Sequence, residues 1–141
     1  MSKFRFNRNN ISNYFPLPNQ IFSLGLCSGE IAVYAYLMFC EDRKTYQCHP
    51  SYKTIGQAIG VSKNTVKKFV DRLVDKQLIT TAPTSVITSK GEKRNGNLRY
   101  TILPIREAVD YFHERQLREL DTALLRQRAK RMVEDYDQKK R

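Results

Sequence analysis

The sequence predicts a mainly α-helical protein with a small β-hairpin and one long helix at its C-terminus. Two short helical patterns meet at the turn Gly60-Val61-Ser62. Residues 80–88 are rich in Thr, Val and Ile, which favours a strand. After Pro104 the chain holds neither glycine nor proline, the residues that most often interrupt a helix.

Length and charge limit the class of protein. The 141 residues are enough for one domain with an appendage, and the net charge of +11 indicates a polyanionic partner. The longest apolar run, residues 31–40, is about half as long as a membrane-spanning helix requires. The N-terminus lacks the apolar core of a signal peptide. We therefore expect a cytoplasmic protein with no membrane partner.

The cysteines do not predict a disulfide or a metal site. Cys27, Cys40 and Cys48 are odd in number, and disulfides are rare in cytosolic proteins. Cys48 and His49 lie next to each other, but structural zinc usually needs two close pairs of ligands. The other histidine, His113, is far along the chain. We expect free thiols, no metal and no cofactor.

The N-terminal third predicts an arm followed by a buried helix. Residues 1–14 are polar and basic, which is typical of a flexible arm, and residues 15–19 contain two prolines that favour an extended chain. A short turn is expected at Ile21 and Phe22. Ser28 is the expected N-cap of a helix whose residues 31–43 are apolar nearly all round, so it should be central. Residues 46–49 suit a short strand.

The segment of residues 50–79 contains the most informative pattern. One helix should begin at Pro50 and Ser51 and end at Gly60, which can adopt the left-handed backbone conformation. Ser62 can cap the next helix, residues 62–77. The apolar residues of this second helix follow a helical period and define its inner face: Val66, Phe69, Val70, Leu73 and Val74.

The opposite face of residues 62–77 is basic and bears an amide. It carries Asn64, Thr65, Lys67, Lys68 and Arg72. A short capped helix with an apolar back and such a front can enter the major groove of DNA. The alternative is an ordinary helical hairpin whose lysines are a solvated face. The combined turn, cap and period favour a DNA-binding helix-turn-helix.

A hairpin and a long helix follow. Residues 90–97 have the composition of a turn, and residues 98–103 alternate until Pro104, so we expect residues 86–88 to pair with residues 98–103. Pro104 suits the first position of a helix that runs to the end. Its apolar spacing slips near Gln116 and past Leu125, so a strict coiled coil is not expected.

The C-terminal helix, residues 105–141, is expected to bind a partner. Four apolar residues are expected to pack against a second copy and give a homodimer: Phe112, Leu117, Leu120 and Leu124. The alternative is that the helix folds back near residues 31–40 and the protein is a monomer.

The order helix, strand, helix, helix and hairpin resembles the winged helix-turn-helix domains of bacterial transcriptional regulators and of replication proteins from plasmids, phages and conjugative elements. The resemblance covers residues 15–104. The segments that carry it are Glu30-Ile-Ala-Val-Tyr-Ala-Tyr-Leu, Pro50-Ser-Tyr-Lys-Thr-Ile-Gly, Gly60-Val-Ser-Lys-Asn-Thr-Val and Leu78-Ile. Gly56 departs from the family, which prefers alanine there, at a cost of about 1 kcal/mol in helix propensity.

The resemblance implies a set of DNA contacts. Residues 62–77 would be the recognition helix, the start of the preceding helix would meet phosphate, and the loop of the hairpin would be a wing. The expected DNA-binding residues are Ser51, Tyr52, Lys53, Ser62, Lys63, Asn64, Thr65, Lys67, Lys68, Arg72, Lys90, Lys93 and Arg94. Asn64 can pair with adenine and Lys68 with guanine, although either can instead hold a phosphate.

These patterns lead to one principal functional expectation and two alternatives. The first is a sequence-specific double-stranded DNA-binding protein that regulates transcription. The second is a replication initiation or DNA-transfer accessory protein of a mobile element, which would use the same chemistry. The third is a winged helix used only for protein contacts, against which the basic front argues. No phosphate loop or catalytic motif is present, so an enzyme is not expected.

Overall fold

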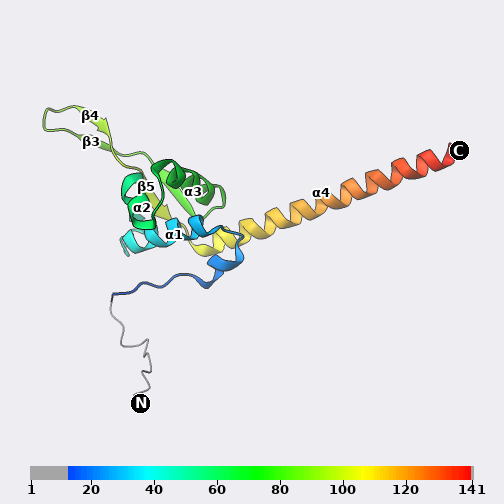
Figure 1. Cartoon of the computed structure of the whole chain (residues 1–141), viewed down its shortest axis with the longest axis horizontal. Coiled ribbons are helices and arrows are strands. Elements are labelled where there is room, and N and C mark those ends of the chain that lie inside the picture. The colour runs from blue at the N-terminus through cyan, green and yellow to red at the C-terminus, as the bar shows by residue number, and fades with distance from the viewer. Residues whose placement is uncertain (1–12, 141) are drawn as a thin grey trace, which may run out of the picture.

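The computed structural model describes residues 13–140, so the predicted arm, residues 1–14, lies almost wholly outside them. Its helices are a short 3₁₀ helix at Asn19–Ser23, α1 (Ser28–Cys40), α2 (Tyr52–Ile59), α3 (Lys63–Asp75) and α4 (Ile105–Lys139). Its strands are β1 (Gln47–Cys48), β2 (Ile79–Ala82), β3 (Ser85–Ile87), β4 (Lys93–Asn95) and β5 (Arg99–Ile102). The predicted fold class, a winged helix-turn-helix with a long C-terminal helix, is confirmed (Figure 1).

Helix α1 is the centre of the domain, as predicted. It packs against α2, α3 and β5, and its buried face consists of Val33, Tyr34 and Leu37. Both of its predicted ends were wrong. Cys27 rather than Ser28 occupies the N-cap position, without a side-chain hydrogen bond. The helix stops at Cys40 because a turn follows it, in which the Tyr46 N–H donates to the Asp42 carbonyl at 2.7 Å.

A buried ion pair joins the start of α1 to the end of α3. The Glu30 side chain is only 3% exposed, and its Oε2 lies 2.7 Å from the Nζ of Lys76. The Nη1 of Arg72 lies 3.9 Å from the other carboxylate oxygen. Next to Glu30, a Cβ on Gly29 would overlap the ring of Phe69. Glycine therefore lets α3 approach α1 closely, and the ion pair compensates for the burial of the carboxylate.

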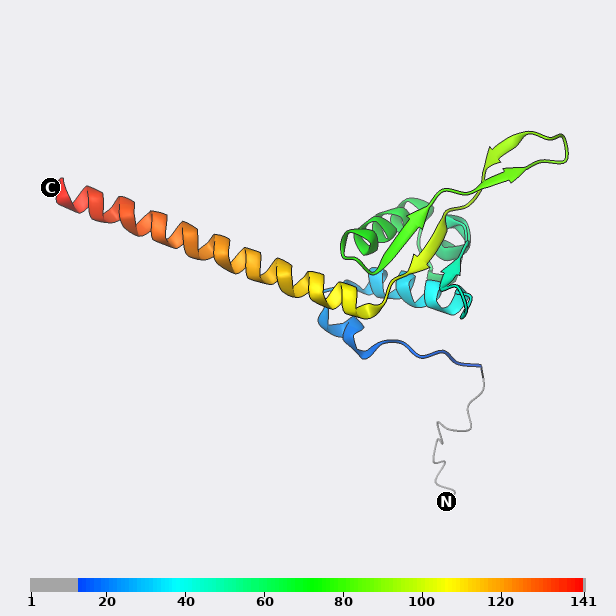
Figure 2. The same ribbon diagram turned by 180° about the vertical axis from the view of Figure 1, so that it is seen from behind.

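The predicted strand pairing was wrong. Strand β2 pairs with β5, and β1 adds to the other edge of β5, which gives the order β1-β5-β2. Strands β3 and β4 form a separate ribbon in which Val86 lies opposite Arg94. Pro83 lacks an N–H and interrupts the long strand predicted at residues 80–88. Beyond this break, the ribbon projects away from the three-stranded sheet (Figures 1 and 2).

Burial in the core explains why the observed strand pairing differs from the predicted one. Ile79, Tyr100 and Ile102 are buried, whereas Val86 and Ile87 are 55% and 76% exposed. Pairing β2 with β5 places the three buried side chains under the helices, whereas the predicted pairing would have brought exposed residues to that site. Register follows burial, because a strand presents alternate residues to the same face.

Helix α4 leaves the domain after its first two turns. It begins at Ile105, with Pro104 at the N-cap position rather than at the first helical position. Ala108 is buried, and Val109 and Phe112 pack partly against the core. From residue 113 to residue 140 every side chain is exposed, and the helix extends as a rod (Figures 1 and 2). It does not fold back along α1.

Within residues 13–140, no helix is both long enough and apolar enough to cross a membrane.

Replacing Lys76 with Met tests the buried ion pair. We expect the free energy of unfolding to fall by about 2 kcal/mol, because the Glu30 carboxylate would remain buried without its closest partner. The loss should be smaller than for a fully buried pair, since the Lys76 side chain is 26% exposed. Urea denaturation measures it. In the double variant Glu30→Gln/Lys76→Met, no buried charge remains and part of the stability should return. A double variant as unstable as Lys76→Met would contradict this explanation.

Candidate nucleic-acid interface

The turn between α2 and α3 has the predicted chemistry. Gly60 ends α2 in the left-handed conformation, with a φ of 79°, and its N–H donates to the Gly56 carbonyl at 2.8 Å. Ser62 is the N-cap of α3, and its Oγ accepts a hydrogen bond from the Thr65 N–H at 3.3 Å. These predictions are confirmed. These hydrogen bonds fix where α2 ends and where α3 begins.

Gly56 is required by this turn. A Cβ at this position would lie 2.5 Å from the carbonyl oxygen of Val61 and 3.5 Å from a methyl group of Val66. The chain therefore gives up the better helix propensity of alanine so that the turn can pass over α2 at close range.

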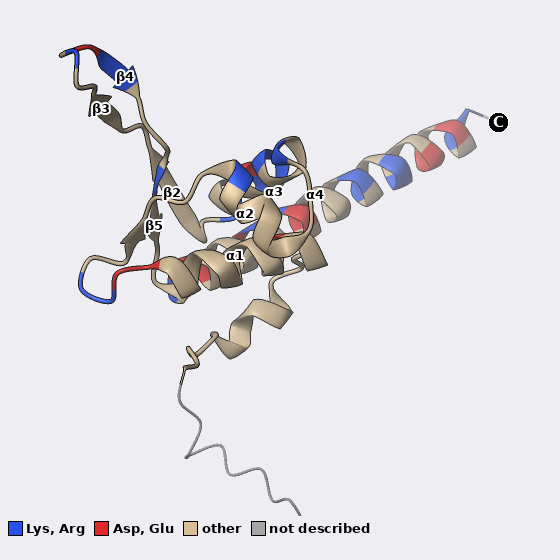
Figure 3. Ribbon diagram, turned by 60° about the vertical axis from the view of Figure 1, so that its left-hand side comes forward, with Lys and Arg blue, Asp and Glu red and all other residues tan. Residues whose placement is uncertain are grey.

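Helix α3 presents one apolar and one polar face. Val66, Val70 and Leu73 are buried, and Phe69 packs against the core. The exposed residues of the N-terminal half are Lys63, Asn64, Lys67 and Lys68. Asp71 and Asp75 are exposed in the C-terminal half, so the positive charge is concentrated where α3 begins. Figure 3 shows basic residues on α3 and on β4.

Several of the side chains proposed as DNA contacts already have partners within the chain. The hydroxyls of Ser62 and Thr65 lie 2.9 Å apart at the start of α3. Ser51 caps α2 by accepting from the Thr54 N–H at 3.0 Å. The guanidinium of Arg72 lies toward Glu30, at 3.9 Å. These side chains support the helices, and the exposed lysines and Asn64 have no such role among the described contacts.

The start of α2 lies beside α3. Tyr52 is partly buried there, and Lys53 is exposed. Burial raises the pKa of the Tyr52 hydroxyl, and the nearby Asp71 carboxylate raises it further. The hydroxyl therefore stays protonated at neutral pH and can donate a hydrogen bond to an anion.

The wing differs from the predicted loop. Lys90 lies in the tip, where the Thr88 N–H donates to the Glu92 carbonyl at 2.9 Å, but Lys93 and Arg94 lie in β4. Since neighbouring residues of a strand point to opposite faces, Lys93 and Arg94 cannot both face the same surface. Arg94 also lies 3.7 Å from the exposed carboxylate of Glu92.

Asn97 joins the base of the wing to the start of α2, a role that the sequence did not predict. Its Nδ2 donates to the carbonyl of His49 at 3.2 Å. The main chain beside it is also tied down, since the Gly96 N–H donates to the Thr84 carbonyl at 2.8 Å. The composition of residues 90–97 signals a turn, but nothing in it identifies a contact with residue 49.

The cysteines are free. The Sγ of Cys48 donates to the Leu37 carbonyl at 3.6 Å. Burial raises the pKa of this thiol to about 12, and Cys40 and Glu41 add to the effect. The thiol is thus protonated and unreactive at neutral pH. Among residues 13–140, no group of three or more His, Cys, Asp or Glu side chains could hold a metal ion.

Part of the chain is similar to known proteins. Residues 24–79, from the chain before α1 to the start of β2, match a family described as a helix-turn-helix domain. One similar solved structure is a "possible transcriptional regulator" from Methanosarcina mazei Go1, with 16% identity over 74% of this chain and 82% of that chain and a TM-score of 0.48. Another is RV1404 from Mycobacterium tuberculosis, with 15% identity over 72% and 64% of the two chains and a TM-score of 0.41. A search of the curated proteins finds no match.

Replacing Gly56 with Ala tests the close approach of the turn. Alanine should gain about 1 kcal/mol in helix propensity, but the overlap with the Val61 carbonyl should cost more, so we expect a net loss of about 1–2 kcal/mol. Thermal denaturation followed by circular dichroism measures it. Gln57→Ala, at the exposed neighbouring position, is the matched control and should change stability by no more than about 0.5 kcal/mol. A Gly56→Ala variant more stable than the parent would show that the turn moves easily.

Proposed function

Because residues 24–79 form a helix-turn-helix domain, we propose that this protein binds a specific sequence of double-stranded DNA and regulates transcription. The observation that supports this most is the exposed N-terminal half of α3. It combines three lysines with an amide side chain, and its other face is fixed by the buried Val66, Val70 and Leu73. A rigid helix that presents such groups suits the major groove.

Each part of this surface has a proposed task. Asn64 reads a base edge, and Lys68 reads a base or holds a phosphate. Lys53, Lys63 and Lys67 neutralise phosphates on either side, because all three are exposed, Lys53 at the start of α2 and the other two in the first turns of α3. The hydroxyl of Tyr52 donates a hydrogen bond to a phosphate. The remaining hydroxyl residues act through their hydroxyls or by supporting the ends of α2 and α3, and they are Ser51, Ser62 and Thr65. Arg72 contributes least, since Glu30 already attracts it.

The wing extends this surface along the DNA. Lys90 at the tip, and one face of β4, would meet the backbone or the minor groove. Only Lys93 or Arg94 can do so at a time, because the two side chains leave opposite faces of the ribbon. We propose no catalytic role for any of these residues.

The rod of α4 supports the proposal of a homodimer. Leu117, Leu120 and Leu124 are 62%, 57% and 46% exposed and lie within two turns. Phe112, also expected in the dimer contact, instead packs against its own domain. Leu125 belongs to another part of the circumference, since successive residues are about 100° apart around a helix. The contact would therefore be a short one rather than a continuous coiled coil.

Strong salt dependence of DNA binding is the first prediction of this function. If about six lysines and arginines neutralise phosphates, a plot of log K against log salt concentration should have a slope near −5. Fluorescence anisotropy with a labelled duplex at several salt concentrations measures the slope. A winged helix used only for protein contacts predicts no measurable binding. A binding constant that stays flat over a tenfold range of salt would exclude the DNA-binding proposal.

Asn64 tests recognition as distinct from positioning. On the sequence selected from random DNA, Asn64→Ala should cost about 1–3 kcal/mol and relax the preference at one base pair. The control is Lys67→Ala, at an exposed lysine that is proposed to hold a phosphate; it should weaken binding to all sequences alike and make the salt slope shallower. Equal losses on selected and random DNA for both variants would mean that Asn64 does not read a base.

The dimer is tested with the double variant Leu120→Glu/Leu124→Glu. Its charges would face the partner, so the full-length protein should sediment as a monomer at concentrations where the parent is a dimer. Thr122→Glu lies on the opposite side of α4, about 180° away, and should leave the dimer intact. A parent protein that stays monomeric at tens of micromolar would exclude the homodimer. It would also favour the replication or transfer alternative, in which repeated sites recruit single copies.

A further inference from the structure

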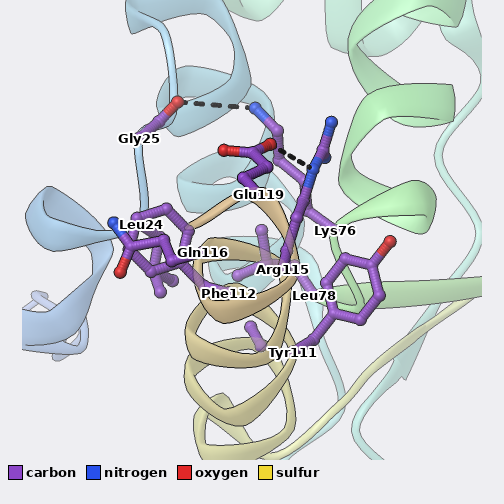
Figure 4. Close-up of a pocket in the computed structure, with 10 residues that line it drawn as sticks. Leu24, Gly25, Lys76, Leu78, Tyr111, Phe112, Arg115, Gln116 and Glu119 are labelled. Carbon is purple, nitrogen blue, oxygen red and sulfur yellow. Dashed lines mark hydrogen bonds and ion pairs between the residues drawn. The ribbon is translucent and has the colours of Figure 1, made fainter. Parts of the chain in front are cut away.

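A cavity of about 300 Å³ lies where three elements meet (Figure 4). Leu24 and Gly25 come from the chain before α1, and Lys76 and Leu78 come from the short segment between α3 and β2. The first turns of α4 close the remaining side. The cavity is therefore separate from the exposed face of α3 that is proposed to bind DNA.

The floor of this cavity is apolar. Leu24, Leu78 and Ala108 are 5%, 1% and 2% exposed. Tyr111 and Phe112 of α4, both partly buried, add aromatic surface. Gly25 has a φ of 68°, and a Cβ there would lie 3.5 Å from the ring of Phe112. The floor can thus accept the hydrocarbon part of a small molecule, and its size is at the lower end of the range for ligand pockets.

Two cations with free donors lie at the rim. The ammonium of Lys76 donates to Glu30 at 2.7 Å and to the Gly25 carbonyl at 3.5 Å, which leaves one of its three hydrogens unused. The Nε of Arg115 lies 3.6 Å from a carboxylate oxygen of Glu119, beyond good hydrogen-bonding distance. Figure 4 shows the side chains of Lys76, Arg115 and Glu119 close together.

We propose that this cavity binds a small molecule with an apolar body and a single carboxylate. The body would lie on Leu24, Leu78 and Ala108, and the carboxylate would accept hydrogen bonds from Lys76 and Arg115. Glu119 would release Arg115 at little cost, because its side chain is 70% exposed and returns to water. The weak, solvated ion pair between Arg115 and Glu119 would be replaced by an ion pair between Arg115 and the partly enclosed carboxylate of the ligand.

The position of the cavity gives this ligand a structural effect. Lys76 is the residue that ends α3, and Arg115 lies on α4 where the rod leaves the domain. A carboxylate held by both residues bridges the two helices and restricts the angle between them. The same molecule would therefore hold α4 in one direction relative to the rest of the domain.

Isothermal titration of the full-length protein with 2-naphthoate tests the proposal. The probe has a flat bicyclic body and one carboxylate, and we expect saturable binding of one molecule per chain. Its neutral isostere, 2-naphthamide, should bind at least about fivefold more weakly, because it cannot form the charge-assisted hydrogen bonds. No saturable binding of 2-naphthoate, or equal affinity for the two probes, would overturn the proposal.

Two variants locate the site. Arg115→Gln should weaken 2-naphthoate about tenfold and leave 2-naphthamide unchanged. Arg118→Gln is the matched control: it makes the same substitution on the same helix, in an ion pair that is also 3.6 Å long, but does not line the cavity. Ala108→Met, which fills the floor, should weaken both probes. If Ala108→Met fails to fold, the comparison of the two arginine variants decides alone, and equal losses in both would refute the site.

Discussion

The buried carboxylate of Glu30 is the constraint on which much of the arrangement depends. Its 2.7 Å contact with Lys76 joins the first turn of α1 to the C-cap residue of α3. Glycine at position 29 removes the side chain that would keep Phe69 of α3 away. The absence of a side chain at position 29 allows α1 and α3 to approach closely. The ion pair then determines that the start of α1 meets the end of α3, because an unpaired carboxylate at this depth would cost stability. The orientation of α3 relative to the rest of the domain follows from both.

The same ion pair affects two other regions. By attracting Arg72, Glu30 draws a positive side chain away from the exposed face of α3, so the proposed DNA-binding surface is concentrated in the first two turns of that helix. By holding Lys76, it also places an ammonium at the rim of the cavity beside α4. The proposed DNA contacts and the proposed carboxylate site thus lie at opposite ends of a single helix, whose position is set by packing against α1.

The wing and the rod are the two parts of the chain with least support from the core. Strands β3 and β4 pair only with each other, and Val86 and Ile87 stay exposed. From residue 113 onward every side chain of α4 is exposed, although large apolar residues continue along the helix. Exposed apolar residues at helical spacing are commonly covered by a partner. The central domain is fixed by its own packing, whereas the rod and the wing are suited to proposed contacts outside the chain.

Local chemistry in the sequence was sufficient for the turn at Gly60-Val61-Ser62, for the Ser62 cap and for the buried face of α3, although the same reasoning misplaced the cap of α1 at Ser28. These features depend on hydrogen bonds and side-chain spacing over a few residues, which a sequence displays directly. The strand pairing, the partners of Glu30 and the role of Asn97 were decided only by tertiary structure. Each joins positions far apart in the chain, such as residues 30 and 76 or 49 and 97. Which residues pair depends on which side chains the assembled core can bury. The pattern of neighbouring residues in the sequence does not contain that information.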